Sequence, residues 1–241
     1  MTMQPKLIYL AQRRPDMTRE QFIARWRQHG LLGMSRPRWA NIARYVHCDV
    51  LDAGTEFLGI SNDYDGVGLI WHKSQEARSA HRADVSSQRE MEADERETFP
   101  EPVVNFCLLA EEIETIHARE PIENPVKLFR FLRCKDDPHR DGLQREIIDR
   151  RPQLANLTRR DRGWPARHCV NASLRPQLEG RTAWGLDADC VEEFWFDNLD
   201  TLAEFRQRCF SDPTLLSLGA YRKVSLIEIV TNEVMLHDVS R

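Results

Sequence analysis

The stretch KLIYLAQR, residues 6–13, reveals how this 241-residue chain is built, because a related stretch, KLFRFLRC, occupies residues 127–134. Three more blocks recur in the same order. ARYVHCDV from residue 43 matches ARHCVNAS from 166, DGVGLIWHKS from 65 matches DCVEEFWFDN from 189, and EEI from 111 matches NEV from 232. Offsets of 121 to 124 residues predict a tandem duplication, with a first domain over residues 1–118 and a second over residues 119–241.

Each copy has the pattern strand, helix, strand, strand, helix, strand. In the first copy we predict strands at Lys6 to Gln12, Ile42 to Leu51, Val67 to Lys73 and Val103 to Glu111. The first helix is expected to begin after Thr18, which forms a capping box with Gln21, and to end at Gly30. Ser74 is the expected N-cap of the second helix. The order βαββαβ is the ferredoxin-like motif, so the predicted fold class is α+β with two tandem ferredoxin-like domains.

We expect the two sheets to face each other within the chain, because each has an apolar face without helices that must be covered. The lumen between the sheets is then a single small-molecule pocket. Residues 86–98, SSQREMEADERET, are almost all polar or charged and are predicted to form an exposed helix or a flap rather than core.

Composition excludes several classes of partner. The net charge is -4, so no basic excess draws the chain to nucleic acid or to an anionic membrane surface. The six cysteines have no CxxC spacing and lie mostly in apolar, strand-like runs, which indicates reduced, structural thiols. No stretch approaches the roughly 20 apolar residues that span a bilayer, and no signal-peptide pattern opens the chain, so we expect a soluble, cytoplasmic protein.

The first half carries the ordered motifs RRP at 13–15, MTREQFIARWRQHG at 17–30, ARY at 43–45, YDGVGLIW at 64–71 and FCLLAEEI at 106–113. The second half keeps chiefly FWFDNLDTL at 194–202. This set resembles the EthD family of dimeric α+β barrels. The resemblance implies that the tandem chain is a built-in pseudo-dimer, and it leaves a homodimer open. It also implies small-molecule chemistry close to that of cofactor-free lactone isomerases and polyketide cyclases.

Side-chain alternation sorts the residues of each strand between the lumen and the helices. Taking Phe129 and Phe131 as helix-facing predicts lumen positions for Leu128, Arg130 and Leu132. The first-half lumen residues are then Leu7, Tyr9, Ala11, Tyr45, His47, Val67, Leu69, Trp71, Cys107 and Leu109. The second-half lumen residues are Arg130, His168, Val170, Val191, Glu193, Trp195 and Glu228. Of these we expect Tyr9, Leu69, Trp71, Cys107, Arg130, His168, Glu193 and Trp195 to contact the ligand.

His29 is the first candidate catalytic residue. Imidazole exchanges a proton near neutral pH, and a place at a helix C-terminus would favour its charged form. The resemblance adds that a histidine here is similar to a catalytic acid or base of a related lactone isomerase. The matching place in the second half holds Arg150, so only one site per chain could use the histidine. The alternative is that His29 packs on Trp26 and donates a single hydrogen bond to a backbone carbonyl.

Tyr45 and His47 are further catalytic candidates, because they could orient a substrate oxygen or relay a proton. Aromatic residues that alternate on a strand also serve as packing, so both interpretations stay open. Arg130 could form a buried ion pair with Glu193 or Glu228, or clamp a carboxylate or enolate through its planar guanidinium.

Two main hypotheses follow. The chain lacks GxGxxG, Walker, GxSxG and HExxH motifs, and His47, Cys48 and Asp49 cannot converge on one metal from consecutive strand positions, so we expect no cofactor and no metal. The first hypothesis is a cofactor-independent isomerase, cyclase or lyase for an aromatic, lactone or polyketide-like metabolite. The second is a non-catalytic small-molecule-binding protein, and a cofactor-free monooxygenase is a minor alternative.

Overall fold

The computed structural model describes residues 4–52, 59–117, 122–134, 140–149, 164–211 and 224–239. The strands are β1 (Pro5–Ala11), β2 (Ile42–Val50), β3 (Gly66–His72), β4 (Cys107–Ile116), β5 (Val126–Cys134), β6 (Arg167–Ser173), β7 (Cys190–Phe196) and β8 (Val224–Asp238). The helices are α1 (Arg19–Met34), α2 (Gln75–Ala83), α3 (Val85–Thr98), α4 (Arg140–Asp149) and α6 (Leu199–Ser211), with short 3-10 helices η1 (Pro37–Asn41), η3 (Val103–Asn105) and η5 (Pro176–Glu179). No helix in the described ranges is long and apolar enough to cross a membrane.

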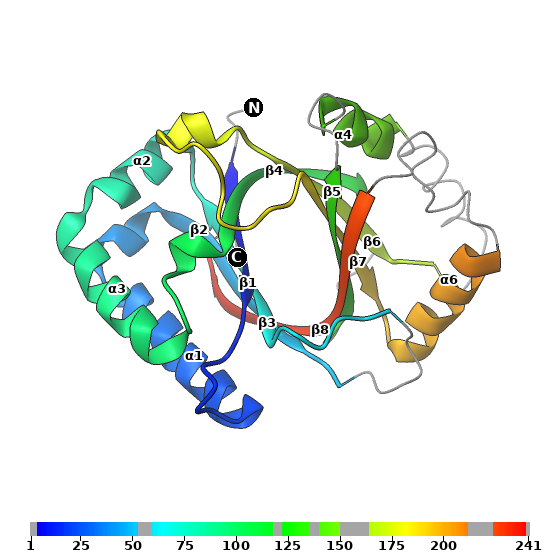
Figure 1. Cartoon of the computed structure of the whole chain (residues 1–241), viewed down its shortest axis with the longest axis horizontal. Helices are drawn as coiled ribbons and strands as arrows, with labels where there is room; N and C mark the ends of the chain where they lie inside the picture. Colours follow the sequence, from blue (N-terminus) through cyan, green and yellow to red (C-terminus); the bar gives the residue numbers. More distant parts are fainter. Residues whose placement is uncertain are drawn as a thin grey trace.

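The strands form one closed barrel in the order β1-β3-β2-β8-β5-β7-β6-β4. Each half contributes four neighbouring strands, β4-β1-β3-β2 and β8-β5-β7-β6, and the halves join where β2 pairs with β8 and β4 pairs with β6. Helices α1, α2 and α3 cover one side of the barrel, and α4 and α6 lie on the opposite side (Figure 1). The α+β class is therefore confirmed. The eight strands share one continuous sheet instead of forming two separate sheets that face each other.

Helix α1 begins as predicted but ends later. Thr18 accepts a hydrogen bond from the Gln21 amide, and the Gln21 side chain accepts one from the Thr18 amide, which completes the capping box. The helix continues to Met34, so the expected end at Gly30 is wrong. Gly30 instead permits close approach to the sheet, because a Cβ there would lie 3.1 Å from the ring of Tyr45.

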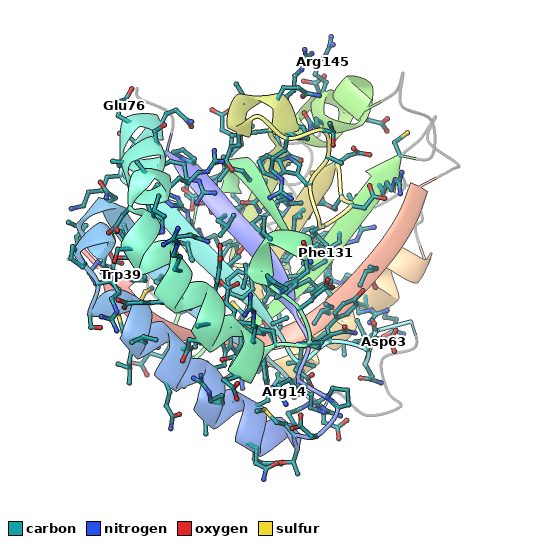
Figure 2. The ribbon with its side chains drawn as sticks, turned by 60° about the vertical axis from the view of Figure 1, so that its left-hand side comes forward. Arg14, Trp39, Asp63, Glu76, Phe131 and Arg145 are labelled. Carbon is teal, nitrogen blue, oxygen red and sulfur yellow. The ribbon has the colours of Figure 1, made fainter. Side chains whose placement is uncertain are left out.

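The barrel interior holds an apolar cluster that includes Val67, Leu69 and Trp71, as predicted, but also Phe129 and Phe131. Figure 2 shows Phe131 among the strands of the barrel. The prediction that these two phenylalanines face the helices is therefore wrong. It follows that most of the predicted lumen residues lie on the helix side instead: Leu7, Tyr9, Ala11, Tyr45, His47, Cys107, Leu109, Leu128, Arg130, Leu132, His168, Val170 and Glu228. The placement was right only on β3 and β7.

The cause of this error is that the strands are buried on both faces. All seven residues of β1 are buried, so the strand carries no polar alternation from which its orientation could be read. Residues opposite each other on paired strands share a face, and Leu69 lies opposite Ile8 while Tyr9 lies opposite Gly68. Leu69 and Tyr9 therefore point to opposite sides of the sheet.

Charged residues form a layer inside the barrel that repeats between the halves. Lys6 lies over Trp71 and bonds Glu112, and Lys127 lies over Trp195 and bonds Glu233. A pair of arginines repeats this pattern of one tryptophan and one glutamate. Arg44 lies over Trp71 and pairs with Glu233, and Arg167 lies over Trp195 and pairs with Glu112. Glu193 accepts hydrogen bonds from both lysines. Burial alone would raise the pKa of Glu193, but the two ammonium groups overcome that effect and lower it.

Residues 86–98 lie within α3 and contribute to the core. Met91, Glu95 and Thr98 are buried, and α3 packs against α1. The prediction of a helix is confirmed, and one face of it is exposed, but the expectation that the segment does not contribute to the core is wrong. The buried side chains recur every three or four residues, but most of them are polar, so the sequence gives no apolar stripe from which to predict the contact.

Candidate active site

A cavity of about 340 Å³ lies between the helix side of the first-half sheet and its covering helices. The sheet contributes Leu7, Tyr9, Tyr45, Ile70 and Cys107 to its wall; α1 and η1 contribute His29, Gly30, Gly33, Arg38 and Trp39; α2 and α3 contribute Arg78, His81, Arg82, Met91 and Glu95. Figure 2 shows Trp39 on this side of the molecule. The volume falls within the range of small-molecule pockets, and the wall combines aromatic and ionisable side chains.

Glycine residues on β3 make room for two large aromatic rings, Tyr9 on this wall and Trp26 behind it. A Cβ at Gly68 would lie 1.9 Å from the ring of Tyr9, and one at Gly66 would lie 2.4 Å from the ring of Trp26. Both positions therefore require glycine for steric reasons. The large rings of Tyr9 and Trp26 occupy the space that two β3 side chains would otherwise fill.

Four buried side chains and the half-buried Arg27 form a hydrogen-bonded chain beneath the cavity. The Arg27 guanidinium donates to His47 Nδ1 at 2.6 Å, and because a guanidinium cannot accept, Nδ1 must be the acceptor. His47 Nε2 then donates to the Tyr45 hydroxyl at 2.5 Å. The Tyr45 hydroxyl in turn lies 3.1 Å from the Tyr9 hydroxyl. Tyr9 also accepts from Trp26 Nε1 at 3.0 Å.

The ionisation of this chain is set by burial. Burial, reinforced by the nearby Arg27, holds the pKa of His47 well below its usual range, so the imidazole is neutral at pH 7. Burial also raises the pKa of Tyr45 and of Tyr9. The two tyrosines are therefore neutral hydroxyls that can donate or accept a hydrogen bond at the floor of the cavity.

His29 is held by a carboxylate that the sequence did not predict. Its Nδ1 lies 2.7 Å from Asp94 Oδ2, and Arg25 bonds the other oxygen of Asp94 at 2.5 Å. Hydrogen bonding to His29, reinforced by Arg25, lowers the pKa of Asp94 to about 2. In the neutral imidazole Nδ1–H donates to this carboxylate, which leaves the lone pair of Nε2 available. The expected position at a helix C-terminus is wrong, because α1 continues for five residues beyond His29.

Glu95 is a second ionisable group on the wall. Its Oε2 accepts a hydrogen bond from the Val103 amide at 3.0 Å, and burial raises the pKa of its carboxyl. A carboxyl with a raised pKa can hold a proton closer to neutral pH than an exposed one. His29 and Glu95 are thus two ionisable side chains on the wall of one cavity.

The predicted site residues fall into three groups. His29, Tyr9, Tyr45 and Cys107 line the cavity, and His47 lies one hydrogen bond behind it. Leu69, Trp71, Glu193 and Trp195 face the barrel interior on the opposite side of the sheet. Arg130 and His168 lie on the helix side of the second half, and Arg150 lies outside the described residues. The structure therefore brings together the three catalytic candidates but only part of the predicted binding set.

The equivalent face of the second half is occupied by ion pairs. Arg130 bonds Glu192 at 2.7 Å and Glu228 at 3.1 Å, and Arg206 of α6 bonds the other oxygen of Glu228. His168 Nε2 lies 3.3 Å from Glu192. Within the described ranges, no cluster of three His, Cys, Asp or Glu side chains has the arrangement of a metal site.

Comparisons with known proteins agree on the fold. No protein-family model matches the chain, and no curated protein matches its sequence. Among solved structures, a protein described as anthrone oxidase-like superposes with a TM-score of 0.65 at 12% identity, over 98% of this chain and 92% of that one. A candidate chlorite dismutase superposes with a TM-score of 0.56 at 10% identity, over 97% and 96%. A candidate monooxygenase from Fusobacterium nucleatum gives 0.54 at 6% identity, over 99% of both chains. These neighbours are of the dimeric α+β barrel type, and this chain has the same fold.

Proposed function

We propose that the chain is a cofactor-independent acid/base enzyme, an isomerase, cyclase or lyase, that acts on a small aromatic, lactone or polyketide-like metabolite. The observation that carries the proposal is the hydrogen bond between His29 and Asp94 at the wall of the first-half cavity. A carboxylate that holds Nδ1–H fixes the tautomer in which Nε2 can accept a proton.

The mechanism needs three roles. His29 Nε2 takes a proton from a carbon activated by a neighbouring carbonyl group. The Tyr45 hydroxyl, positioned by His47, donates a hydrogen bond to the oxygen on which negative charge develops. Glu95, whose pKa burial raises, returns a proton at a second position of the substrate.

The duplication and the EthD kinship belong to the same proposal. Two copies, residues 1–118 and 119–241, account for the matching strand order of the two halves and for the repeated interior layer of lysine, tryptophan, arginine and glutamate. We propose that the chain is a tandem EthD-type protein, and that its barrels can associate further as a homodimer. The ligand is a small molecule bound in the first half.

A cofactor-free monooxygenase is the second candidate. It is favoured by the similarity to the anthrone oxidase-like protein, since the carbanion formed by His29 could react with dioxygen in place of being reprotonated. A non-catalytic binding protein would use the same cavity without the proton transfer.

Deuterium exchange into anthrone, a ketone with an acidic methylene group, tests the proposal. Proton NMR in anaerobic D₂O should show faster exchange with the wild-type protein than in buffer, and His29→Ala should lower the catalysed rate by roughly a hundredfold or more. Tyr45→Phe should cost less, and His117→Ala, which changes an exposed histidine, should have no effect. Thermal melting checks that each variant folds.

Three results separate the candidates. Exchange that needs His29 without dioxygen uptake supports the isomerase, cyclase or lyase. Dioxygen uptake that also needs His29 supports the monooxygenase. Binding of anthrone without exchange supports the non-catalytic binding protein. A folded His29→Ala variant that exchanges deuterium at the wild-type rate contradicts the mechanism.

A further inference from the structure

Arg38 differs from the other arginines on the cavity wall in its partners. Arg78 makes a two-point ion pair with Glu179, and Arg82 lies 3.8 Å from the same carboxylate. Arg181 donates to the backbone carbonyls of Ala183 and Val104. Arg38 is partly buried, donates from Nη1 to the neutral amide of Gln88 at 2.6 Å, and has no carboxylate within ion-pair distance in the described part of the chain.

The carboxylates around Arg38 act on its charge through space and not through an ion pair: Glu95, Asp84 and Glu92 each favour the charged guanidinium, but none of the three lies within ion-pair distance of it. Gln88 Nε2 donates a hydrogen bond to Glu92 at 2.8 Å, so the side chain of Gln88 lies between that carboxylate and the guanidinium. His81 donates from Nδ1 to the Arg38 carbonyl at 3.2 Å, and burial together with Arg38 lowers the pKa of His81 to about 3, so it is neutral. Burial lowers the pKa of Arg38 itself. Partial burial of a cation that has no ion-pair partner is unfavourable, and proteins normally pair the cations that they bury fully.

Arg38 is also held in place. Its backbone carbonyl accepts hydrogen bonds from the Asn41 side chain at 3.1 Å and from His81, while Gln88 holds one end of the guanidinium. Pro37 begins the 3-10 helix that carries it. This arrangement fixes a guanidinium at the cavity before any ligand arrives, which reduces the entropy lost on binding.

We propose that Arg38 binds the carboxylate of an aromatic carboxylic acid in the first-half cavity. The planar guanidinium matches a carboxylate at two points, and such charge-assisted bonds are stronger than neutral ones. The rings of Tyr45 and Trp39 on the same wall offer the aromatic contact. This inference rests on the proposed function for its choice of cavity, and it names the substrate class as an anionic aromatic compound.

Binding of 2-naphthoate and 2-naphthamide, measured by titration calorimetry, tests the inference. The two probes share their rings and differ in charge. The wild-type protein should bind naphthoate at least tenfold more tightly than naphthamide. Arg38→Met should remove that preference and leave naphthamide binding within about twofold, whereas Arg38→Lys, which keeps the charge but not the planar fork, should retain part of it.

Arg89→Met is the matched control, because Arg89 is exposed on α3 and does not line the cavity. It should change naphthoate binding by less than about twofold. Equal binding of the two probes by the wild-type protein, undetectable naphthoate binding, or an unchanged preference in Arg38→Met or in a second variant, Arg38→Gln, would overturn the inference. The assay involves no turnover, so a charge preference without deuterium exchange refutes only the proposed catalysis, and exchange without a charge preference refutes only this subsite.

Discussion

On the helix side of the barrel, equivalent strand positions carry neutral side chains in the first half and charged side chains in the second. Tyr9 on β1 lies opposite Gly68 and Cys107, and Arg130 on β5 lies opposite Glu192 and Glu228. In the first half, the neutral hydroxyl of Tyr9 joins a hydrogen-bonded chain below a cavity. In the second, the guanidinium of Arg130 lies between two carboxylates.

The difference shows that the same fold can hold a cavity in one half and a buried ion-pair network in the other. A glycine opposite Tyr9 leaves room for aromatic side chains, whereas the glutamate opposite Arg130 uses the equivalent space for an ion pair. Replacing a whole buried ion pair by apolar groups is often neutral, but removing one partner leaves an uncompensated charge. The stability of the second half should therefore be more sensitive to removal of a single charge, and the stability of the first half to an added side chain at a glycine.

Arg130→Met should have the largest effect on stability, a loss of about 3 to 5 kcal/mol in the free energy of unfolding. The cause is that Glu192 and Glu228 would each lose a buried cationic partner. Urea denaturation measures the change. Arg133→Met on the same strand is the control, because the Arg133 side chain is 49% exposed and its ion pair should contribute less than about 1 kcal/mol. Equal losses for the two variants would contradict the comparison.

Gly68→Ala should cost about 1 to 3 kcal/mol, because the added Cβ overlaps the ring of Tyr9. The same denaturation experiment applies. Gly33→Ala serves as control, since a Cβ there meets Trp39 at an ordinary 3.4 Å and alanine favours the helix. A Gly68→Ala protein as stable as wild type would show that the glycine does not make room for the aromatic wall.

Tyr9→Phe should cost about 1 to 2 kcal/mol, because Trp26 Nε1 would keep its buried N–H without the tyrosine acceptor. The ring, and with it the apolar packing, is retained. Tyr64→Phe, on a partly buried ring outside the hydrogen-bonded chain, should change stability by less than about 0.5 kcal/mol. The account of the buried chain fails if both variants behave alike.

Asp94→Asn should have the smallest effect, about 1 kcal/mol at pH 7, because the lowered pKa sets an upper limit of about 2.5 kcal/mol and solvent screens part of the interactions with His29 and Arg25. The pKa of Asp94 is lowered in the folded state to about 2, so its carboxylate stabilises the protein above the unfolded pKa near 4 and loses that contribution as the pH falls toward 2. Melting temperatures at pH 7, 4 and 3 should show the wild-type advantage shrinking. A difference in melting temperature between wild type and Asp94→Asn that grows as the pH falls would contradict the lowered pKa of Asp94.

The element order was predictable because it depends on local signals and on the repeat. The capping box at Thr18 and the matching blocks at Lys6 and Lys127 identified the order of helices and strands, and the α+β class followed. The orientation of the strands was not predictable, because Lys6 and Lys127 are buried inside the barrel, where a charged residue is not expected. Their partner Glu193 is known only from the fold.

The candidate site was predictable in part. His29, Tyr45 and His47 were named as candidates from residue chemistry and from the resemblance, but Tyr45 and His47 were expected on the lumen side of the sheet and lie on the helix side. Asp94 and Glu95 were missed, because their segment is polar almost throughout and nothing in the sequence distinguishes the residues that face α1 from those that face solvent. The role of Asp94 depends on its contact with His29, 65 residues away in the chain.

The central claim is that the ligand binds on the helix side of the first half and not inside the barrel. A crystal structure of the complex with 2-naphthoate tests it most directly. The account predicts the ring in the cavity beside Tyr45, with one polar edge within hydrogen-bond reach of His29 Nε2 and the carboxylate on Arg38. A ring seated in the barrel interior between Trp71 and Trp195, or against Arg130 in the second half, would contradict it.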